Sequence, residues 1–279
     1  MDHSPDTASA SSEAAAPASV AILGVPLALT DYGGTIAWMS AMVARNQRGY
    51  VCVAAVHTVM ACRDDLELRA AVLGSDFTVP DGQPLVWAIN ALGHNLTERV
   101  YGPELMERHC AHAALTGTKI YLYGGRHQDA LDQLTRNLRR RHPGLKVVGG
   151  YSPPFRPLDD VEQEAVAARI NRSGADVVWV GIGVPRQEKW MALMRARLDA
   201  PVLVGVGAAF DFHAGLVRQA PRWLQRRGLE WAFRLLAEPR RLWRRYLRYN
   251  PLFVIGFARQ YVRHRRAFAT EARRVYRRR

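Results

Sequence analysis

Long hydrophobic runs are missing from this sequence. The best candidate, Leu252 to Ala258, is far shorter than the ~20 apolar residues that a membrane-spanning helix requires, so we expect no membrane span. Residues 1–19 consist largely of Ala, Ser, Pro and Asp, and no basic start is followed by an apolar run. This composition predicts a disordered N-terminal segment and argues against a signal peptide.

Cysteine is scarce. Cys52, Cys62 and Cys110 are odd in number and show no paired Cys-x-x-Cys spacing, which argues against both a disulfide framework and a zinc site. Cys52 and Cys110 stand in apolar or helical contexts, where core residues are expected more often than reactive thiols. This usage is typical of a cytoplasmic protein.

Metal clamps and the dinucleotide fingerprint are also missing. His109 and His112 lie three residues apart on a predicted helix, but no acidic partner stands at ligand spacing. The Asp-Asp pairs at 64–65 and 159–160 are typical of helix starts. No Gly-x-Gly-x-x-Gly follows the first strand with an acidic residue ~20 positions later, which argues against a nicotinamide-dependent oxidoreductase.

Positive charge, in contrast, is abundant and concentrated. The net charge of the chain is +14, yet residues 218–279 alone carry 19 Arg, no Lys and three Glu, which is a net charge of +16. The rest of the chain carries a net charge of −2. One basic region on a nearly neutral body predicts contact with a polyanionic partner.

Strand-like and helix-like segments alternate between Val20 and Phe212. Short apolar or β-branched runs predict strands at 51–56, 119–123, 146–148, 176–181 and 201–206. Helical periodicity predicts helices at 35–46, 104–115, 128–141, 161–171 and 187–198. The pattern indicates an α/β fold with a Rossmann-like, mainly parallel sheet and helices on both faces, whose ligands bind at the carboxyl ends of the strands.

The C-terminal part is rich in arginine, leucine and aromatic residues. Trp243, Tyr246 and Leu247 share one helix face, and arginines fill the remainder, as in helices that lie on a membrane surface. Pro239 and Pro251 predict two or three short helices. We therefore expect three parts: residues 1–19 disordered, 20–217 the Rossmann-like domain, and 218–279 an arginine-rich helical appendage.

Glycines follow several of the predicted strands. Gly124-Gly125, Gly181-x-Gly183 and Gly205-x-Gly207 could bring backbone N–H groups close to a phosphate at a helix N-terminus. Tight packing explains any single one of these turns equally well. Three of them on one sheet edge favour a nucleotide pocket.

Asp81 and Arg99 could carry chemistry. Asp81 lies in Pro80-Asp81-Gly82 after a strand-like stretch, where it is either an ordinary turn residue or a carboxylate that takes a proton from a substrate hydroxyl. Arg99 either pairs with Glu98 at the surface or neutralises a diphosphate by forked hydrogen bonds.

Three further polar residues follow later strands. Gln187 and Glu188 fall in the first turn of a predicted helix, where the amide could bind sugar hydroxyls or phosphate and the carboxylate could simply stabilise the helix. Asp211 lies beyond the last strand between aromatic residues, as a structural cap or a ligand contact.

Several motifs in this order resemble the WecG/TagA/CpsF family of glycosyltransferases (glycosyltransferase family 26). The resemblance covers about residues 22–246. The matching residues are Pro80-Asp81-Gly82, Glu98-Arg99-Val100-x-Gly102, Tyr123-Gly124-Gly125, Gly181-x-Gly183-x-Pro185-x-Gln187-Glu188, Gly207-Ala208-Ala209-Phe210-Asp211-Phe212, Gly228-Leu229-Glu230-Trp231-x-x-Arg234 and Glu238-Pro239-x-Arg241.

The resemblance implies an inverting enzyme of bacterial surface polysaccharide synthesis, an exopolysaccharide or cell-wall polymer type. It would move a hexose or N-acetylhexosamine-type sugar from a UDP-sugar to a polyprenyl-diphosphate-linked sugar at the cytoplasmic face of the inner membrane. No metal or other cofactor would be needed, in agreement with the missing clamp. The donor sugar, the acceptor and the oligomeric state, including a homo-oligomer, stay open.

Roles for individual residues also follow from the resemblance. Asp81 matches the general base, Arg99 and Gln187 match residues near the donor diphosphate and sugar, and Asp211 matches another pocket residue. Gly124, Gly125, Gly183 and Glu188 lie in the motifs expected around the donor. The appendage residues that match arginines over the diphosphates are Arg234, Arg241 and Arg244.

One departure concerns a Thr-x-Asn element that the family often has at a strand end. Val53 and Ala55 stand at those positions here, and His57 or Thr58 could substitute for the lost polar groups. A helix-start Thr is equally well explained as structural.

A nucleic-acid-binding protein is the alternative function, since arginine interleaved with aromatic residues also suits RNA. That alternative leaves the turn motifs of the neutral body unexplained. We therefore expect a UDP-sugar, a polyprenyl-linked acceptor and an anionic membrane surface as partners, and no nucleic acid.

Overall fold

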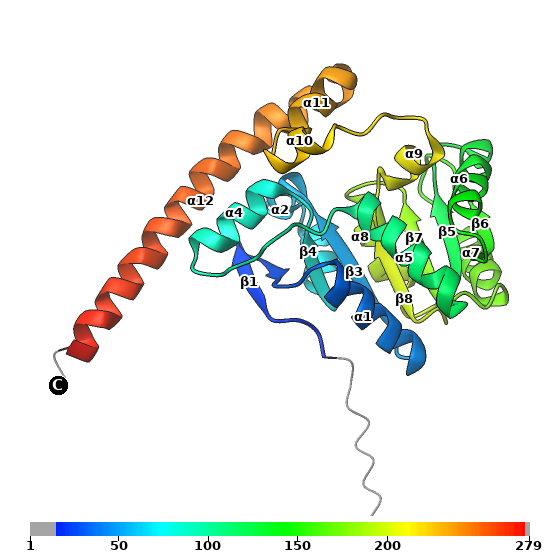
Figure 1. The fold of residues 1–279 in the computed structure, drawn as a ribbon, viewed down its shortest axis with the longest axis horizontal. Helices are drawn as coiled ribbons and strands as arrows, with labels where there is room; N and C mark the ends of the chain where they lie inside the picture. The colour runs from blue at the N-terminus through cyan, green and yellow to red at the C-terminus, as the bar shows by residue number, and fades with distance from the viewer. Residues whose placement is uncertain (1–14, 277–279) are drawn as a thin grey trace, which may run out of the picture.

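The computed structural model describes the backbone of residues 15–276 and their side chains, except those of Arg222, Arg226, Arg241 and residues 268–276. Six parallel strands form one sheet in the order β4-β3-β8-β7-β5-β6 (Figure 1). Their bounds are β3 Gly49–Ala54, β4 Phe77–Pro80, β5 Lys119–Gly124, β6 Lys146–Tyr151, β7 Val177–Gly181 and β8 Val202–Gly205. This confirms the expected Rossmann-like α/β fold.

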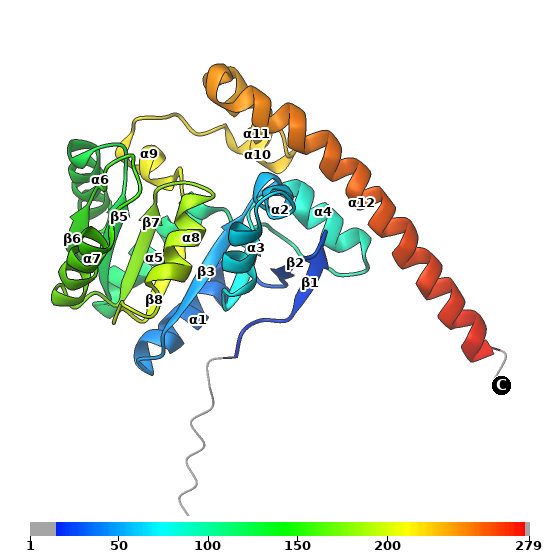
Figure 2. The ribbon, with the colours of Figure 1, turned by 180° about the vertical axis from the view of Figure 1, so that it is seen from behind.

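Helices cover both faces of the sheet (Figures 1 and 2). They are α1 Tyr32–Ala44, α2 Val56–Ala61, α3 Leu66–Leu73, α4 Gln83–Ala91, α5 Gly102–Thr116, α6 Gln128–Arg141, α7 Asp160–Arg172, α8 Arg186–Met194 and α9 Ala209–Ala214. Alternate residues of a strand pack on opposite faces of the sheet, because successive side chains of a strand point in opposite directions. On β7, Val178 and Val180 pack in the cluster of α7 and α8, whereas Val177 and Trp179 pack in the cluster of α5 and α6.

The two Asp-Asp pairs begin helices, as the sequence predicts. The Asp65 carboxylate accepts a hydrogen bond from the backbone N–H of Leu68 at 2.9 Å. Asp159 and Glu162 form a capping box at the start of α7. The three cysteines are free and buried, and the sequence predicted the burial of Cys52 and Cys110.

The sequence patterns did not predict the short helices α2, α3, α4 and α9, nor an N-terminal hairpin. β1 (Ser19–Ile22) and β2 (Val25–Ala28) form a separate antiparallel hairpin. Its turn places Leu23 and Gly24 at φ +51° and +86°. A non-glycine residue at positive φ is uncommon, so the turn left no clear signal in the sequence.

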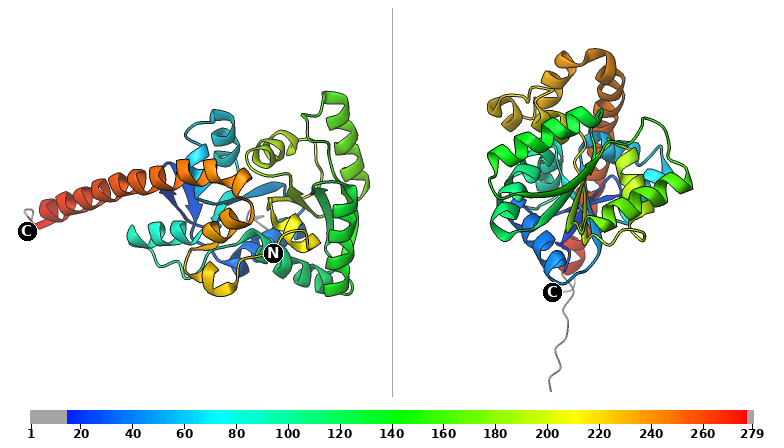
Figure 3. Two further views of the ribbon diagram at one scale, coloured as in Figure 1. Left: turned by 90° about the horizontal axis from the view of Figure 1, so that it is seen from above. Right: turned by 90° about the vertical axis from the view of Figure 1, so that its right-hand side faces the viewer.

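The C-terminal appendage contains α10 (Arg222–Arg226), α11 (Glu230–Ala237) and α12 (Pro239–Tyr276). The prediction of short helices is wrong for α12, which runs through Pro251 and extends beyond the α/β core (Figures 1 and 3). Pro239 fits the first turn of a helix, where no backbone N–H is needed. Pro251 removes one helical hydrogen bond, and the nearby burial of Phe253 against the core compensates for this loss.

α12 is fixed to the body by side chains of its own. The Gln260 amide accepts a hydrogen bond from the Leu23 N–H at 2.8 Å and donates one to the Ala21 carbonyl at 2.6 Å. Arg248 forms an ion pair with Asp64 at 2.9 Å. Gln260 therefore continues the hydrogen bonding of β1 and holds the helix along it.

Replacing Gln260 by Leu is expected to weaken this docking by about 1 kcal/mol, the net contribution of one or two partly exposed hydrogen bonds. Amide hydrogen exchange at Leu23 should then accelerate about fivefold. Arg259→Gln, at the preceding exposed position, is the control and should leave this exchange unchanged. Equal exchange rates in both variants would contradict the role of Gln260.

No helix in the described part of the chain is long and apolar enough to cross a membrane.

Candidate active site

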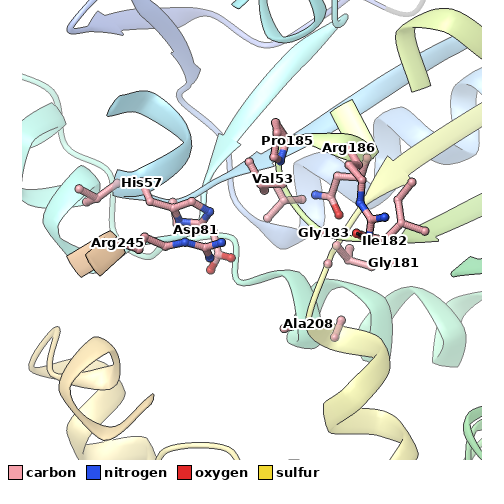
Figure 4. Close-up of a pocket in the computed structure, with 18 of the residues that line it drawn as sticks. Val53, His57, Asp81, Gly181, Ile182, Gly183, Pro185, Arg186, Ala208 and Arg245 are labelled. Atoms are coloured by element: carbon pink, nitrogen blue, oxygen red, sulfur yellow. Dashed lines mark hydrogen bonds between the residues drawn. The ribbon is translucent and has the colours of Figure 1, made fainter. Parts of the chain in front are cut away.

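The carboxyl ends of the strands open into one large cavity of about 1670 Å³. The Rossmann-like core supplies one wall, with Ala55 after β3, Asp81 after β4, Gly125 after β5 and Ile182 after β7. The appendage supplies the opposite wall from α11 and α12. Figure 4 shows two poles, His57, Asp81 and Arg245 on one side and Gly181 to Arg186 on the other.

Asp81 is held by backbone hydrogen bonds to β3 and, through Pro80, to the loop before α5. Its N–H donates to the Ala54 carbonyl at 2.8 Å, and the preceding Pro80 carbonyl accepts from Val100 at 2.9 Å. Burial raises the pKa of the Asp81 carboxyl to about 7, with Glu230 adding to the rise and the Arg99 and Arg234 charges opposing it. Such a carboxyl can accept and release a proton near neutral pH.

Arg99 connects Asp81 with the appendage. Its guanidinium lies 3.4 Å from the Asp81 carbonyl oxygen, and the other terminal nitrogen contacts the Glu230 carboxylate at 2.7 Å and the Gln225 amide oxygen at 2.8 Å. The same guanidinium lies over the Tyr101 ring, 4.3 Å from its centroid. The side chains of Arg99 and Glu230 are only 13% and 12% exposed, so solvent screens this pair weakly.

The glycines serve two purposes. A Cβ on Gly124, at φ +135°, would lie 2.5 Å from the Gly181 carbonyl, so this glycine allows β5 and β7 to approach each other and does not line the cavity. Gly125 and Gly183 do line it, at φ +95° and +81°. Gly125, like Gly181, brings backbone to the cavity surface without a side chain in the way.

Gln187 and Glu188 begin α8 but face different surroundings. Gln187 lines the cavity, and its amide nitrogen donates to the Glu188 carboxylate at 2.9 Å. Glu188 lies beneath it in the core and does not line the cavity. Burial raises the Glu188 pKa to about 7. Because Glu188 fixes the amide, the Gln187 carbonyl oxygen is turned towards Gly207, and this oxygen has no hydrogen-bond partner within the described part of the chain.

Asp211 is already paired in this structure. Arg126 binds it with two hydrogen bonds, at 3.1 and 3.0 Å, and both residues line the cavity. The Arg126 guanidinium also lies 3.9 Å from Glu238, just before α12. Asp211 therefore orients Arg126 and links the core to the beginning of α12.

The appendage arginines differ in their placement. Arg234 lines the cavity, with its guanidinium 5.7 Å from the centroid of the Phe212 ring. Arg244 is exposed beside Trp243 and does not line the cavity, whereas the next residue, Arg245, does. The side chain of Arg241 lies outside the described residues. Successive helix residues are about 100° apart, so Arg244 and Arg245 point in different directions.

A comparison of the sequence with models of known protein families agrees with this geometry. The family model described as "Glycosyl transferase WecG/TagA/CpsF family" matches residues 20–267. The chain belongs to this family. The match extends over the Rossmann-like core and most of α12, so the glycosyltransferase match includes both walls of the cavity.

The end of β3 forms part of the cavity wall in this glycosyltransferase. Val53 and Ala55 line the cavity, and so does His57, whereas Thr58 is buried and does not. Burial and the Arg245 and Arg234 charges lower the pKa of His57 to about 3, so its ring is neutral at physiological pH. Its Nε2 is buried without a hydrogen-bond partner in residues 15–276. A substrate hydroxyl could satisfy it.

The cavity residues to which the sequence analysis gave no role include three charged ones of the glycosyltransferase: Arg126, Glu230 and Arg245. Glu230 stood in a quoted motif without a role, and Arg126 directly follows Gly124-Gly125. For Arg245, the sequence does contain a pattern that could have predicted its position. Arg245, Tyr249, Phe253, Phe257 and Tyr261 recur every four residues and mark the face of α12 towards the core.

Among the described residues, no three His, Cys, Asp or Glu side chains are grouped so that they could hold a metal ion.

Proposed function

We propose that this glycosyltransferase moves a hexose or N-acetylhexosamine-type sugar from a UDP-sugar to a polyprenyl-diphosphate-linked sugar, with inversion and without a metal ion. The single observation that carries the proposal is the cavity itself. It combines a carboxyl with a pKa of about 7 at Asp81 with the guanidinium groups of Arg99, Arg234 and Arg245, beside glycine turns at the ends of the strands. Such a site suits a pair of substrates that each carry one diphosphate.

The reaction would be a single displacement. Asp81 takes the proton of the acceptor hydroxyl, whose oxygen forms the new bond to the anomeric carbon. The bond between that carbon and the UDP oxygen breaks, and UDP leaves with the electron pair. Arginines supply the positive charge that stabilises the departing diphosphate, which is the role that a metal ion has in many other sugar transfers.

The residues at the other pole suit the donor. The N-terminus of α8 and the backbone at Gly125 and Gly183 supply dipoles for the donor diphosphate. The free oxygen of Gln187 can accept a hydrogen bond from a sugar hydroxyl. Arg126, oriented by Asp211, adds a charge on this side.

The test is a panel of UDP-sugars offered with a polyprenyl-diphosphate-linked acceptor, with and without chelator. Transfer of at least one UDP-sugar at an equal rate in both conditions is expected. Transfer that requires an added divalent ion would contradict the metal-free reaction. No transfer from any UDP-sugar, by a protein that still binds UDP, would contradict the donor class.

We further propose that the enzyme works as a peripheral protein on the cytoplasmic face of the inner membrane. Trp243 and Leu247 are 44% and 65% exposed on α12, beside the exposed Arg244 and Arg248. Aromatic and apolar side chains flanked by arginine suit the surface of an anionic bilayer.

Replacing both Trp243 and Leu247 by Ser is expected to weaken binding to anionic vesicles at least tenfold, because two large side chains no longer enter the lipid. Vesicle co-sedimentation measures this binding. A raised salt concentration should also weaken the binding of the wild-type protein to the vesicles. Leu115→Ser, at an exposed position of α5 on the core, is the control. Equal losses in the two variants would contradict a membrane-binding face on α12.

A further inference from the structure

The active-site cavity does not end at its charged groups. It continues between α4 and α12, where the lining residues include Trp87 and Ala91 from α4 and Val254, Phe257, Ala258 and Tyr261 from α12. We call this part the α4–α12 groove. From Arg245 to Tyr261, α12 advances by about 24 Å, so the groove is long compared with a sugar.

The charge along this cavity changes abruptly. Arg99, Arg234 and Arg245 surround the Asp81 end. Beyond Arg245, α12 contributes no charged side chain to the lining up to Tyr261, although the same stretch carries Arg248 and Arg259. These two arginines are exposed outside the groove.

Large apolar side chains remain exposed to solvent in the groove. Trp87 is 52% exposed and Val254 is 65% exposed, and both line the same cavity as Arg245. Trp87 is held in place from one side by Gly228, where an added Cβ would lie 2.9 Å from the indole ring. Apolar surface that stays open beside a fixed cationic site is a feature of binding sites for amphiphiles.

From this geometry we infer that the α4–α12 groove binds the proximal part of the isoprenoid chain of the acceptor, while Arg234 and Arg245 hold its diphosphate. The inference rests on the proposed function and assigns a binding site to the lipid part of the proposed acceptor. One molecule with an anionic head and an apolar chain matches both the charged end and the continuous apolar part of the cavity. The chain would leave the protein along α12, towards the bilayer.

The experiment compares two soluble probes with the same head group, farnesyl diphosphate and dimethylallyl diphosphate, by calorimetry in the absence of lipid. Wild type is expected to bind the longer chain at least about tenfold more tightly, because burial of two more methylene groups is sufficient for this difference. Equal affinities would overturn the inference.

Two adjacent positions of α12 give a matched pair of variants. Val254 lines the groove, and Ile255 is 50% exposed but does not line it. Val254→Glu should reduce the chain-length preference to about twofold and leave dimethylallyl diphosphate affinity unchanged, whereas Ile255→Glu should keep the wild-type preference. An equal loss in both would assign the effect to unspecific hydrophobic binding or to the bilayer face of α12, and would overturn the inference.

A second variant approaches the groove from the other helix. Ala91→Trp, at an exposed position of α4, should also remove the preference without a change of charge. A preserved preference in Ala91→Trp would contradict a chain that lies between the two helices. The probes need neither donor nor transfer. A flat preference with intact sugar transfer therefore rejects the groove alone, and a clear preference without any sugar transfer rejects the proposed reaction alone.

Discussion

An Asp81→Asn variant is expected to transfer sugar about 1000-fold more slowly than wild type, as the loss of a general base predicts. Asparagine has nearly the same shape but accepts no proton from the attacking hydroxyl. Its side chain fits the same place, because Asp81 is positioned by backbone hydrogen bonds to Ala54 and, through Pro80, to Val100. The measurement is kcat with saturating donor and acceptor.

Two controls separate chemistry from folding in this variant. UDP affinity should stay within about twofold, since Asp81 lies at the pole away from the glycine turns (Figure 4). The melting temperature should be no lower than that of wild type, because burial disfavours the charged form of Asp81 and asparagine carries no charge. Activity near the wild-type level would reject Asp81 as the base.

Breaking the pair of Arg99 and Glu230 should have the second largest effect. Arg99→Gln is expected to lower kcat about 100-fold, as the loss of one charged donor at a developing anion does. Glu230→Gln is expected to lower it at least tenfold, although Glu230 need not touch the substrate. Its carboxylate holds the guanidinium at 2.7 Å and joins α11 to the core.

A double-mutant cycle tests whether the two residues act together. The two losses should be less than additive in Arg99→Gln/Glu230→Gln, with a coupling energy of at least about 1 kcal/mol. Asp64→Asn is the matched control, because it breaks another ion pair between core and appendage, with Arg248, that is 46% and 63% exposed. Exposed ion pairs contribute little to the stability of a contact, so the activity of Asp64→Asn should differ less than twofold from that of wild type. Fully additive losses would contradict the proposed link.

The core of the fold could be predicted from local patterns. Buried parallel strands need apolar residues on both sides, so runs such as Val177 to Val180 were recognisable. The path of α12 was not predictable in the same way. The penalty of Pro251 is visible in the sequence, whereas the burial of Phe253 and the contact of Gln260 with β1 arise only when distant segments meet.

The candidate site likewise contains residues that could be predicted from the sequence and contacts that could not. Asp81 and Gly125 directly follow strands, and Gln187 lies in the first turn of the helix after β7. The parallel sheet necessarily brings strand ends together at one edge. The partners of Arg99 and Asp211 were not predictable, because each pairing depends on rotamers and on a distant segment. Arg99 pairs with Glu230, from the appendage, and the sequence equally allowed its neighbour Glu98.

The appendage reaches the Asp81 carboxyl, the proposed catalytic base. The charged groups that act on the Asp81 carboxyl are Arg99 from the core and Glu230 and Arg234 from α11. Only the carboxylate form can take the proton, so activity should rise with pH through the raised pKa of about 7. Removal of the Glu230 charge lowers the Asp81 pKa, since Glu230 raises it and Arg99 is then left free to stabilise the carboxylate.

The most direct measurement is therefore the pH dependence of kcat/KM for wild type and Glu230→Gln. In wild type we expect an acidic limb near pH 7, and in the variant this limb should move to lower pH even though the variant is slower. An acidic limb at the same pH in both proteins would contradict the claim that α11 forms part of the active site.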